Sequence, residues 1–303
     1  MMTTRNDFRC GVVALAGLPN TGKSTLMNRL IGQKIAITSA KPQTTRNQIR
    51  TIYTDDEAQI VFIDTPGIHA AKNKLGVHME RAWDGALKDV DAVLFMTVPA
   101  AGTTETEREV LSRLEKTRIP VYIVVNKADS FDETFVSSTV ARYQREVPFA
   151  KVFCASALRG MGVEELLQNL KSVLPYGEPL YGEDDITDQP VREIAAEIIR
   201  EKTLRLLNDE VPHGIAVTIE KMRERTTRTG DAVTDVEASV ICEKESHKGI
   251  VIGKNASMLK KIGSLAREDM EKLLEQKVNL QLFVKVRKDW RNDAAQLRGL
   301  GYR

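Results

Sequence analysis

The sequence predicts an α/β domain, with a mostly parallel sheet wrapped by helices, followed by a smaller α+β domain. In the first half, short apolar runs alternate with amphipathic helical patterns, which is typical of a wrapped parallel sheet. The pattern changes after Pro190, where a helix and two strands follow in direct succession. Between the halves, 175–190 contains Pro, Gly and five acidic residues but no basic one, which indicates a linker. We therefore predict domains at 1–174 and 191–303, joined by residues 175–190.

The elements of the first domain follow from its apolar runs. Residues 11–16 form a continuous apolar run, as expected of a strand buried on both faces. A helix is predicted at 22–31, and the polar, Thr-rich stretch 33–50 predicts a mobile loop. Runs at 49–54 and 59–64 flank Asp55-Asp56 and predict a hairpin. Later strands are predicted at 92–98, 121–125 and 151–154, and helices at 74–88, 105–116, 133–146 and 163–173.

The second domain has a different order of elements. Its spacing predicts a helix at 191–207, strands at 215–222 and 233–242, a helix at 259–274 and a strand at 278–286. This α+β unit is too short for a second doubly wound sheet.

Composition restricts the class of protein. The chain is 28% charged and 42% hydrophobic, as in ordinary globular proteins, and no apolar run approaches the roughly 20 residues of a membrane-spanning helix. We see no signal peptide, and the three cysteines, Cys10, Cys154 and Cys242, lie far apart, so we expect a reducing cytoplasm rather than a disulfide framework. Residues 191–303 carry 22 basic and 18 acidic side chains, which fits either a nucleic-acid partner or a solvated charged face.

A phosphate-binding loop is predicted at residues 17–24, which match G-x-x-x-x-G-K-[ST] between a predicted strand and a predicted helix. Glycines let backbone N–H groups surround phosphate oxygens, and the helix N-terminus adds a favourable dipole. Lys23 would meet the β/γ-phosphates, and Ser24 would offer its hydroxyl to Mg²⁺. The predicted nucleotide-binding residues of this loop are Gly17, Asn20, Thr21, Gly22, Lys23, Ser24 and Thr25.

Two further motifs select the nucleotide. Asp64 to Gly67 end an apolar strand, where the carboxylate can hold Mg²⁺ through water and the Gly67 N–H can meet a γ-phosphate. Asn126-Lys127-Ala128-Asp129 follows another strand, and one carboxylate accepts both N1–H and the N2 amino group of guanine. Ser156 and Ala157 follow a weaker strand, where a backbone N–H could reach guanine O6. The motifs thus favour GTP and GDP over ATP.

These motifs resemble the G1, G3, G4 and G5 boxes of GTPases. The sequence Pro42-Gln43-Thr44-Thr45-Arg46 resembles the Thr-Thr-Arg loop of bacterial ribosome-assembly and tRNA-modification GTPases, and this likeness assigns Thr45, rather than Thr44, to Mg²⁺ and the γ-phosphate. It implies Ser24, Thr45 and Asp64 as metal ligands, and Lys23, Thr45 and Gly67 as catalytic residues.

The side chain that orients the attacking water in Ras-like enzymes is missing. Ile68 follows Gly67, and an aliphatic group cannot orient water. His69 is one candidate replacement, and a group supplied by a partner is another. A monovalent cation is the third candidate, because potassium-dependent relatives carry Asn at the position of Asn20. This resemblance adds Asn20 to the predicted catalytic residues and K⁺ to the predicted cofactors. We expect intrinsic GTP hydrolysis to be slow.

The second domain contains a motif at residues 251–263 that resembles a type II KH domain, whose G-x-x-G loop clamps single-stranded nucleic acid. The fourth loop position is Ala256 instead of Gly, and Ala disfavours positive φ. A helix start with solvated lysines is the alternative. The predicted RNA-binding residues are Gly253, Lys254, Asn255, Ala256, Lys260 and Lys261.

Both domains, the acidic linker and the tail 297–302 together resemble the Era family of bacterial GTPases. The resemblance implies binding to the 3′ end of 16S ribosomal RNA, a role in assembly of the 30S subunit, GTP-dependent exposure of the RNA-binding surface, and a cytoplasmic protein with a peripheral fraction at the inner membrane. DNA is not expected as a partner. Two alternatives stay open: an RNA-binding scaffold with negligible hydrolysis, and a phosphotransferase acting on a small molecule.

Overall fold

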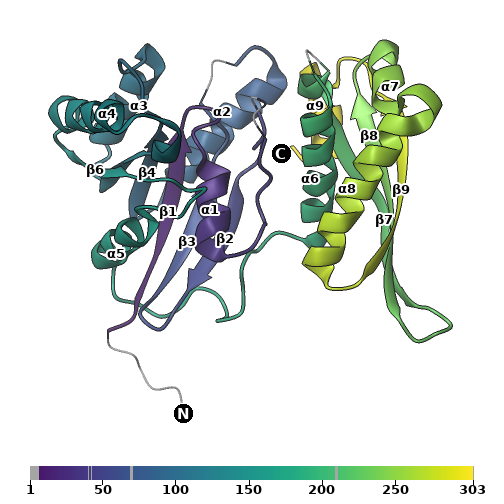
Figure 1. The fold of residues 1–303 in the computed structure, drawn as a ribbon, viewed down its shortest axis with the longest axis horizontal. Helices are drawn as coiled ribbons and strands as arrows, with labels where there is room; N and C mark the ends of the chain where they lie inside the picture. The colour runs from purple at the N-terminus through teal and green to yellow at the C-terminus, as the bar shows by residue number, and fades with distance from the viewer. Residues whose placement is uncertain (1–6, 40, 42, 69–70, 209–210, 303) are drawn as a thin grey trace. The chain divides into compact units, whose positions relative to one another are not determined.

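The computed structural model describes residues 7–39, 41, 43–68, 71–208 and 211–302, drawn as a coloured ribbon in Figure 1. The chain forms two compact units. The first consists of Met1–Ala36, Thr45–Ala70 and Met79–Asp188. The second consists of Ile37–Thr44, Ala71–His78 and Gln189–Arg303, so that two short segments of the N-terminal half group with the C-terminal half.

A six-stranded sheet in the order β2-β3-β1-β4-β5-β6 forms the centre of the first unit. Its neighbouring strands pair in parallel, except that β2 runs antiparallel to β3. The strands are β1 (Arg9–Gly17), β2 (Ile49–Thr54), β3 (Ala58–Asp64), β4 (Ala92–Thr97), β5 (Val121–Val125) and β6 (Ala150–Cys154). The predicted parallel sheet and the predicted hairpin are both confirmed.

Helices cover both faces of this sheet (Figure 1). They are α1 (Lys23–Ile31), α2 (Lys74–Ala86), α3 (Glu105–Glu115), α4 (Glu133–Glu146) and α5 (Val163–Val173). Trp83 of α2, Val110 of α3 and Tyr143 of α4 pack with the strand residues Phe95 and Ile123 in one buried cluster. The helices α1 and α5 lie on the opposite face. The apolar strands are buried on both sides for this reason, as their continuous hydrophobic sequences predict.

Helix α3 begins at a capping box that is readable in the sequence. The Thr104 hydroxyl accepts the Glu107 N–H at 3.2 Å, and the Glu107 carboxylate accepts the Thr104 N–H at 2.9 Å. The same carboxylate is buried and accepts the hydroxyls of Thr97 at 2.8 Å and Tyr143 at 3.2 Å. One side chain therefore caps α3 and ties it to β4 and α4.

The segment predicted as a linker packs on the first unit as far as Asp188. The Gln59 amide, fully buried, accepts the N–H groups of Leu180 and Tyr181 and donates to the Tyr181 carbonyl at 3.0 Å. The Ile52 N–H donates to the Ile186 carbonyl at 2.9 Å. These hydrogen bonds hold part of the acidic, Pro- and Gly-containing stretch that was predicted as a linker against the first unit.

An ion-pair cluster joins α5 to the β2–β3 turn. The nearly buried Lys171 ammonium donates to the carboxylates of Asp55 and Glu57, the latter at 2.9 Å. Burial alone would raise the pKa of Asp55, but hydrogen bonds from Lys171, from the Tyr53 hydroxyl and from two backbone N–H groups hold it below its ordinary value of 3.8. Asp55 therefore stabilises the fold above pH 3.8, and this contribution is lost as acid protonates it.

We predict that Lys171→Met lowers the free energy of unfolding of the first unit by about 1–3 kcal/mol at pH 7, because two carboxylates lose their cation. The difference from the parent should shrink as the pH falls below 3.8, where Asp55 becomes protonated in both chains. Urea unfolding, with Trp290 replaced by Phe so that Trp83 is the sole tryptophan, measures this. Lys116→Met, at an exposed position, should change little, and a pH-independent difference would contradict the assignment.

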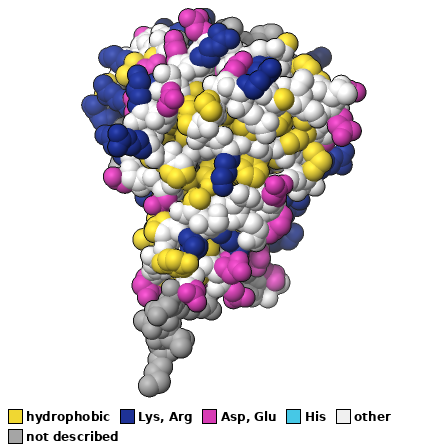
Figure 2. Space-filling model, turned by 90° about the vertical axis from the view of Figure 1, so that its left-hand side faces the viewer, with side chains coloured by type: hydrophobic (Ala, Val, Ile, Leu, Met, Phe, Trp, Pro, Cys, Tyr) yellow, Lys and Arg dark blue, Asp and Glu magenta, His cyan; other side chains and the backbone are white. Residues whose placement is uncertain are grey.

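Strand β6 is an edge of the sheet, and Figure 2 views the first unit from the side of β6 and α4. Hydrophobic side chains show between charged ones on this face. The exposed large hydrophobic residues of the neighbouring loops are Phe131, Phe149, Leu158 and Met161. Lys151 is exposed in the strand itself, and a lysine on an edge strand opposes pairing with another sheet.

The second unit has a three-stranded sheet in the order β7-β8-β9, in which β7 and β8 are antiparallel and β8 and β9 parallel. Helices α6 and α8 pack against each other and against the sheet. The elements in chain order are α6 (Val191–Leu206), β7 (Ala216–Thr226), β8 (Ala232–Cys242), α7 (Glu245–Ile252), α8 (Ser257–Leu274), β9 (Lys277–Val286) and α9 (Ala294–Gly299). This order confirms the predicted type II KH arrangement.

Within the second unit, α6 holds the segment Ile37–Thr44. Glu201 of α6 is fully buried, and its carboxylate accepts the Thr38 N–H at 2.9 Å and the Arg205 guanidinium at 2.9 Å. Arg200 donates to the Thr44 carbonyl. The residue that precedes Thr45 is thus fixed by the second unit.

None of the helices in the described part of the chain is both long and apolar enough to cross a membrane.

Candidate nucleotide site and RNA-binding loop

The predicted nucleotide residues gather at one edge of the six-stranded sheet. β1 ends at Gly17, β3 at Asp64, β5 at Val125 and β6 at Cys154, and these strands are parallel. Their carboxyl ends therefore bring the four motifs together, and ligands of open α/β sheets bind at such an edge.

Lys23 begins α1 and is buried under the phosphate loop. Its ammonium donates to the Gly17 carbonyl at 3.1 Å and to the Leu18 carbonyl at 3.0 Å. Burial lowers the pKa of Lys23 to about 8, and the Asp64 carboxylate opposes this shift. A phosphate oxygen beside this ammonium would favour its charged form, as the predicted role requires.

Three oxygen groups converge where Mg²⁺ is predicted. The Ser24 hydroxyl donates to Asp64 Oδ2 at 2.6 Å, and the Thr45 hydroxyl lies 3.2 Å from both Ser24 Oγ and Asp64 Oδ2. Asp64 is fully buried, burial raises its pKa, and its Oδ1 has no hydrogen-bond partner in the described structure. A hard cation with few protein ligands, such as Mg²⁺, fits this donor set. Thr44, the residue not chosen, instead donates its hydroxyl to the Lys41 carbonyl at 2.6 Å.

Gly67 lies directly against the phosphate loop. A Cβ atom at Gly67 would come within 2.8 Å of Pro19 Cα, so a side chain would force the two loops apart. The Ile68 N–H donates to the Gly17 carbonyl at 3.3 Å, and its side chain packs on the apolar cluster under α2, α3 and α4. The aliphatic side chain that replaces the water-orienting Gln therefore serves packing. His69, the candidate replacement, lies outside the described residues.

Asn126 connects the base-recognition loop to the phosphate loop. It is buried, its amide donates to the Thr21 carbonyl at 2.8 Å, and its oxygen accepts the Ala157 N–H at 2.9 Å. Lys127 takes a left-handed conformation, and Asp129 is exposed, as a carboxylate that meets guanine should be. The Ser156 N–H donates to the Met161 carbonyl at 2.9 Å. Both N–H groups considered for guanine O6 thus have partners within the protein, and that assignment stays a prediction.

Sequence reasoning missed Arg29. Its guanidinium donates to the Ala157 carbonyl at 3.1 Å and to the Leu158 carbonyl, which fixes the loop after β6 from helix α1. An arginine within an amphipathic helix gives no sequence signal of such a contact, because the partner is more than a hundred residues away.

We predict that Gly22→Ala weakens GDP binding at least about ten-fold. Gly22 has φ 98°, and a Cβ there would lie 2.2 Å from Asn126 Nδ2. Left-handed backbone alone costs an L-residue about 1–2 kcal/mol, which is roughly a ten-fold change in affinity. Titration with fluorescent GDP measures it. Gly102→Ala, where no atom lies within 4 Å, is the matched control, and equal affinities of the two variants would contradict the geometry.

The predicted RNA-binding loop joins α7 to α8 in the second unit. Gly253 has φ 71° and Ala256 φ 59°, so the alanine adopts the left-handed conformation that the motif's glycine would take. Lys254 and Asn255 are exposed in this loop, and Lys260 and Lys261 are exposed on α8. Ala256 therefore adopts positive φ despite its side chain, at a cost in strain of about 1 kcal/mol.

Trp290 is a structural residue of the second unit. It is fully buried, donates its indole N–H to the Gly214 carbonyl at 3.0 Å and stacks on Tyr302 at 5.8 Å. Stacking on RNA is excluded by this burial.

The first unit is a P-loop GTPase domain, because one edge of its sheet carries a phosphate loop, an Asp-x-x-Gly turn and an Asn-Lys-x-Asp loop. The second unit has a KH fold. A family model described as 50S ribosome-binding GTPase matches residues 12–127, and one described as KH domain matches residues 210–291.

Relatives match the whole chain. GTPase Era of Clostridium tetani is 48% identical over 98% of this chain and 99% of its own length, and GTPase Era of Clostridium kluyveri is 46% identical over 98% and 100%. A structure of an Aquifex aeolicus Era variant bound to GDP and AlF4⁻ is 37% identical with a TM-score of 0.92, covering 97% of this chain and 99% of that one. A structure of Era with MgGDPNP and nucleotides 1506–1542 of 16S ribosomal RNA is 37% identical with a TM-score of 0.93, and it covers 97% of this chain and 99% of that one.

The chain belongs to the Era family of GTPases. It is accordingly an enzyme that hydrolyses GTP, and the family resemblance predicted from the sequence is confirmed.

Proposed function

We propose that this GTPase is a nucleotide-controlled switch that binds the 3′ end of 16S ribosomal RNA through its KH loop and assists assembly of the 30S subunit. The observation that carries the proposal is the loop Gly253–Ala256 between two helices, in which Asn255 and Ala256 have left-handed backbone and Lys254 is exposed, as a loop that clamps nucleic acid requires a basic side chain. A solved structure of Era, 37% identical over 97% of this chain, is a complex with nucleotides 1506–1542 of 16S ribosomal RNA.

In the proposed hydrolysis, the chain positions charge around the phosphates instead of supplying a covalent catalyst. Lys23 and the N–H of Gly67 would stabilise charge on the phosphate oxygens. Ser24, Thr45 and Asp64 would hold Mg²⁺, which supplies neutralising charge to the β/γ-phosphates. Asp129 would accept the two adjacent N–H donors of guanine, and Asn126 and Lys127 would support that loop.

K⁺ is the proposed substitute for the missing catalytic side chain. Ile68 has no donor or acceptor and packs on the apolar cluster, so it does not orient water. Asn20 lies in the phosphate loop with φ 63° and is exposed, so it is within the loop that would surround the phosphates. A cation held there would add the charge that an arginine finger supplies elsewhere.

We expect GTP hydrolysis several-fold faster in KCl than in NaCl at equal ionic strength, with a slow rate overall. Asn20→Ala should remove the difference between the rates in the two salts. Phosphate release under multiple turnover measures both effects. Equal rates of the parent chain in the two salts would exclude the K⁺ proposal and leave GTP hydrolysis itself untouched.

The segment Ile37–Thr44 supplies a route for coupling. It belongs to the second unit, is held by Glu201 and Arg200 of α6, and is followed directly by Thr45 at the proposed Mg²⁺ site. Movement of Thr45 toward a γ-phosphate would therefore pull on a segment that α6 restrains. This supports the proposal that the bound nucleotide changes RNA affinity.

We expect a 16S 3′-end oligonucleotide to bind more tightly with a non-hydrolysable GTP analogue than with GDP, and a scrambled oligonucleotide to bind weakly in both states. Replacing Lys254, Lys260 and Lys261 by Ala should weaken the GTP-state affinity about ten-fold or more and reduce its salt dependence. Fluorescence anisotropy at fixed salt measures both affinities.

The matched control for this experiment is Lys272→Ala, an exposed lysine in the last turn of the same helix, which should change little. Binding that ignores nucleotide and sequence, or that survives the triple substitution, would contradict the RNA-binding proposal.

We place the protein in the cytoplasm, with a fraction held peripherally at the inner membrane. The support for this placement is family membership alone.

A further inference from the structure

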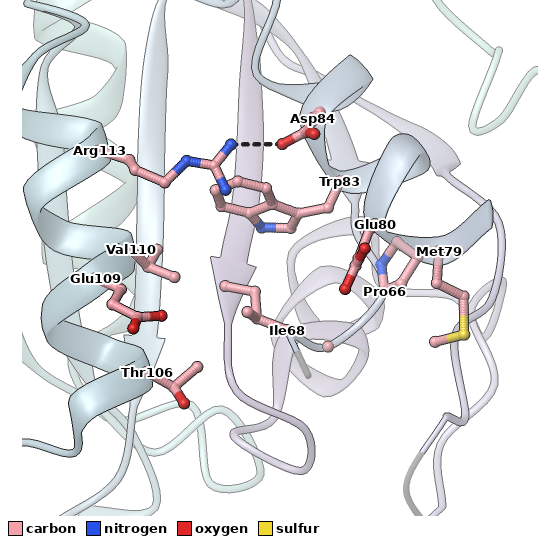
Figure 3. A pocket seen from close by; sticks show the side chains of 11 residues that line it. Pro66, Ile68, Met79, Glu80, Trp83, Asp84, Thr106, Glu109, Val110 and Arg113 are labelled. Carbon is pink, nitrogen blue, oxygen red and sulfur yellow. Dashed lines mark hydrogen bonds and ion pairs between the residues drawn. The ribbon is translucent and has the colours of Figure 1, made fainter. Parts of the chain in front are cut away.

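A cavity of about 380 Å³ lies in the first unit between α2, α3 and the loop that ends at Ile68 (Figure 3). Its volume is within the range of small-ligand pockets. Nothing in the hydrolysis of GTP as described above uses α3 or the part of α2 that lines it. The side chains around the cavity therefore need a separate explanation.

The polar lining of the cavity is acidic. Glu80, Asp84 and Glu109 contribute carboxylates, against the single guanidinium of Arg113. Arg113 forms an ion pair with Asp84 at 2.6 Å, so the charges of these two side chains cancel. Its guanidinium also lies over the Trp83 ring, 4.6 Å from the ring centroid. Glu109 is exposed and has no ion-pair partner among the described residues. The lining therefore favours a cation.

The cavity also contains a buried donor with no acceptor. Trp83 is 4% exposed, and its Nε1 has no hydrogen-bond partner within the described part of the chain. In Figure 3 the N–H edge of the ring faces the side of the pocket where Ile68 lies. Buried N–H groups nearly always have a hydrogen-bond partner, so a bound molecule that offers an acceptor to the Trp83 N–H would be held favourably. Ile68 and Val110 supply the apolar walls.

We propose that this cavity binds a basic side chain presented by a peptide segment of a partner protein. The cationic group meets Glu109, an adjacent backbone carbonyl accepts the Trp83 N–H, and the aliphatic stem covers Ile68 and Val110. A nucleic acid is disfavoured here, because its phosphates would face the carboxylates of Glu80 and Glu109. A protein partner thus engages the GTPase domain at a surface separate from the KH loop.

The position of the cavity connects it to the nucleotide. Gly67 lines the cavity, and its other side touches Pro19 of the phosphate loop. The Ile68 N–H is bonded to the Gly17 carbonyl at 3.3 Å. A peptide seated against Ile68 therefore acts on the backbone that surrounds the phosphates. The effect of the peptide on the phosphate loop rests on the proposed function of the GTPase site. Binding of the peptide in the cavity does not rest on it.

The test uses the full chain with GDP and ¹⁵N-labelled tryptophan. The chain has two tryptophans, and Trp290 donates its N–H to the Gly214 carbonyl, so the two indole signals report on separate places. Acetyl-Leu-Arg-amide should shift the Trp83 signal saturably and leave the Trp290 signal in place. Acetyl-Leu-Glu-amide, of similar size and opposite charge, should not bind.

Glu109→Gln should weaken binding of the arginine peptide about three-fold, as expected for loss of one exposed ion pair. Glu115→Gln, on the same helix and outside the cavity, is the matched control and should change nothing. No saturable shift, an equal response to the glutamate peptide, or unchanged affinity of Glu109→Gln would overturn the proposal. A shift produced by a uridine trinucleotide and not by the arginine peptide would assign the cavity to RNA and also overturn it.

Discussion

The buried carboxylate of Asp64 is the interaction on which the nucleotide site depends. It ends a strand that is buried on both faces, and it accepts the hydroxyls of Ser24 and Thr45 while Lys23 lies close enough to oppose its protonation. Three separate segments of the chain therefore share one buried negative charge. If Asp64 lost its charge, the hydroxyls of Ser24 and Thr45 would lose their common acceptor. A bound Mg²⁺ would complete the site, because its charge balances that of the carboxylate. The order of strands in the sheet matters mainly because it brings these loops to the same edge.

Much of this arrangement could be predicted because each motif carries its own structural context. The motifs at Gly17 to Ser24, Asp64 to Gly67 and Asn126 to Asp129 stand at the ends of predominantly apolar strands, and parallel strands place their ends together. The type II KH order of helices and strands in the second unit could also be predicted, because apolar spacing marked these elements along the chain. Thr45 required a family resemblance, since nothing in a Thr-rich loop distinguishes it from Thr44 until the fold places one hydroxyl beside Asp64.

What could not be predicted depends on contacts between distant residues. The segment 175–188 has the composition of a linker, yet Gln59 and Ile52 bind its backbone. Strand β7 continues to Thr226, beyond the predicted Met222, because Arg225 pairs with Asp235 of β8 at 2.7 Å, outside any apolar pattern. Ala256 shows the reverse case: propensity opposed the left-handed conformation, and the loop between two helices imposes it. Local rules fail where tertiary hydrogen bonds or closure of a tight loop outweigh a propensity of about 1 kcal/mol.

The amide of Asn126 carries a consequence for how the enzyme discriminates among nucleotides. It connects the Thr21 carbonyl, in the loop around the phosphates, to the Ala157 N–H, in the loop beside the base. One side chain therefore joins the two loops that are predicted to hold the phosphates and the base. A purine that fits poorly at Asp129 would disturb the amide and, through it, the cradle for the phosphates, so that selectivity for the base is expressed in the residence time of the whole molecule.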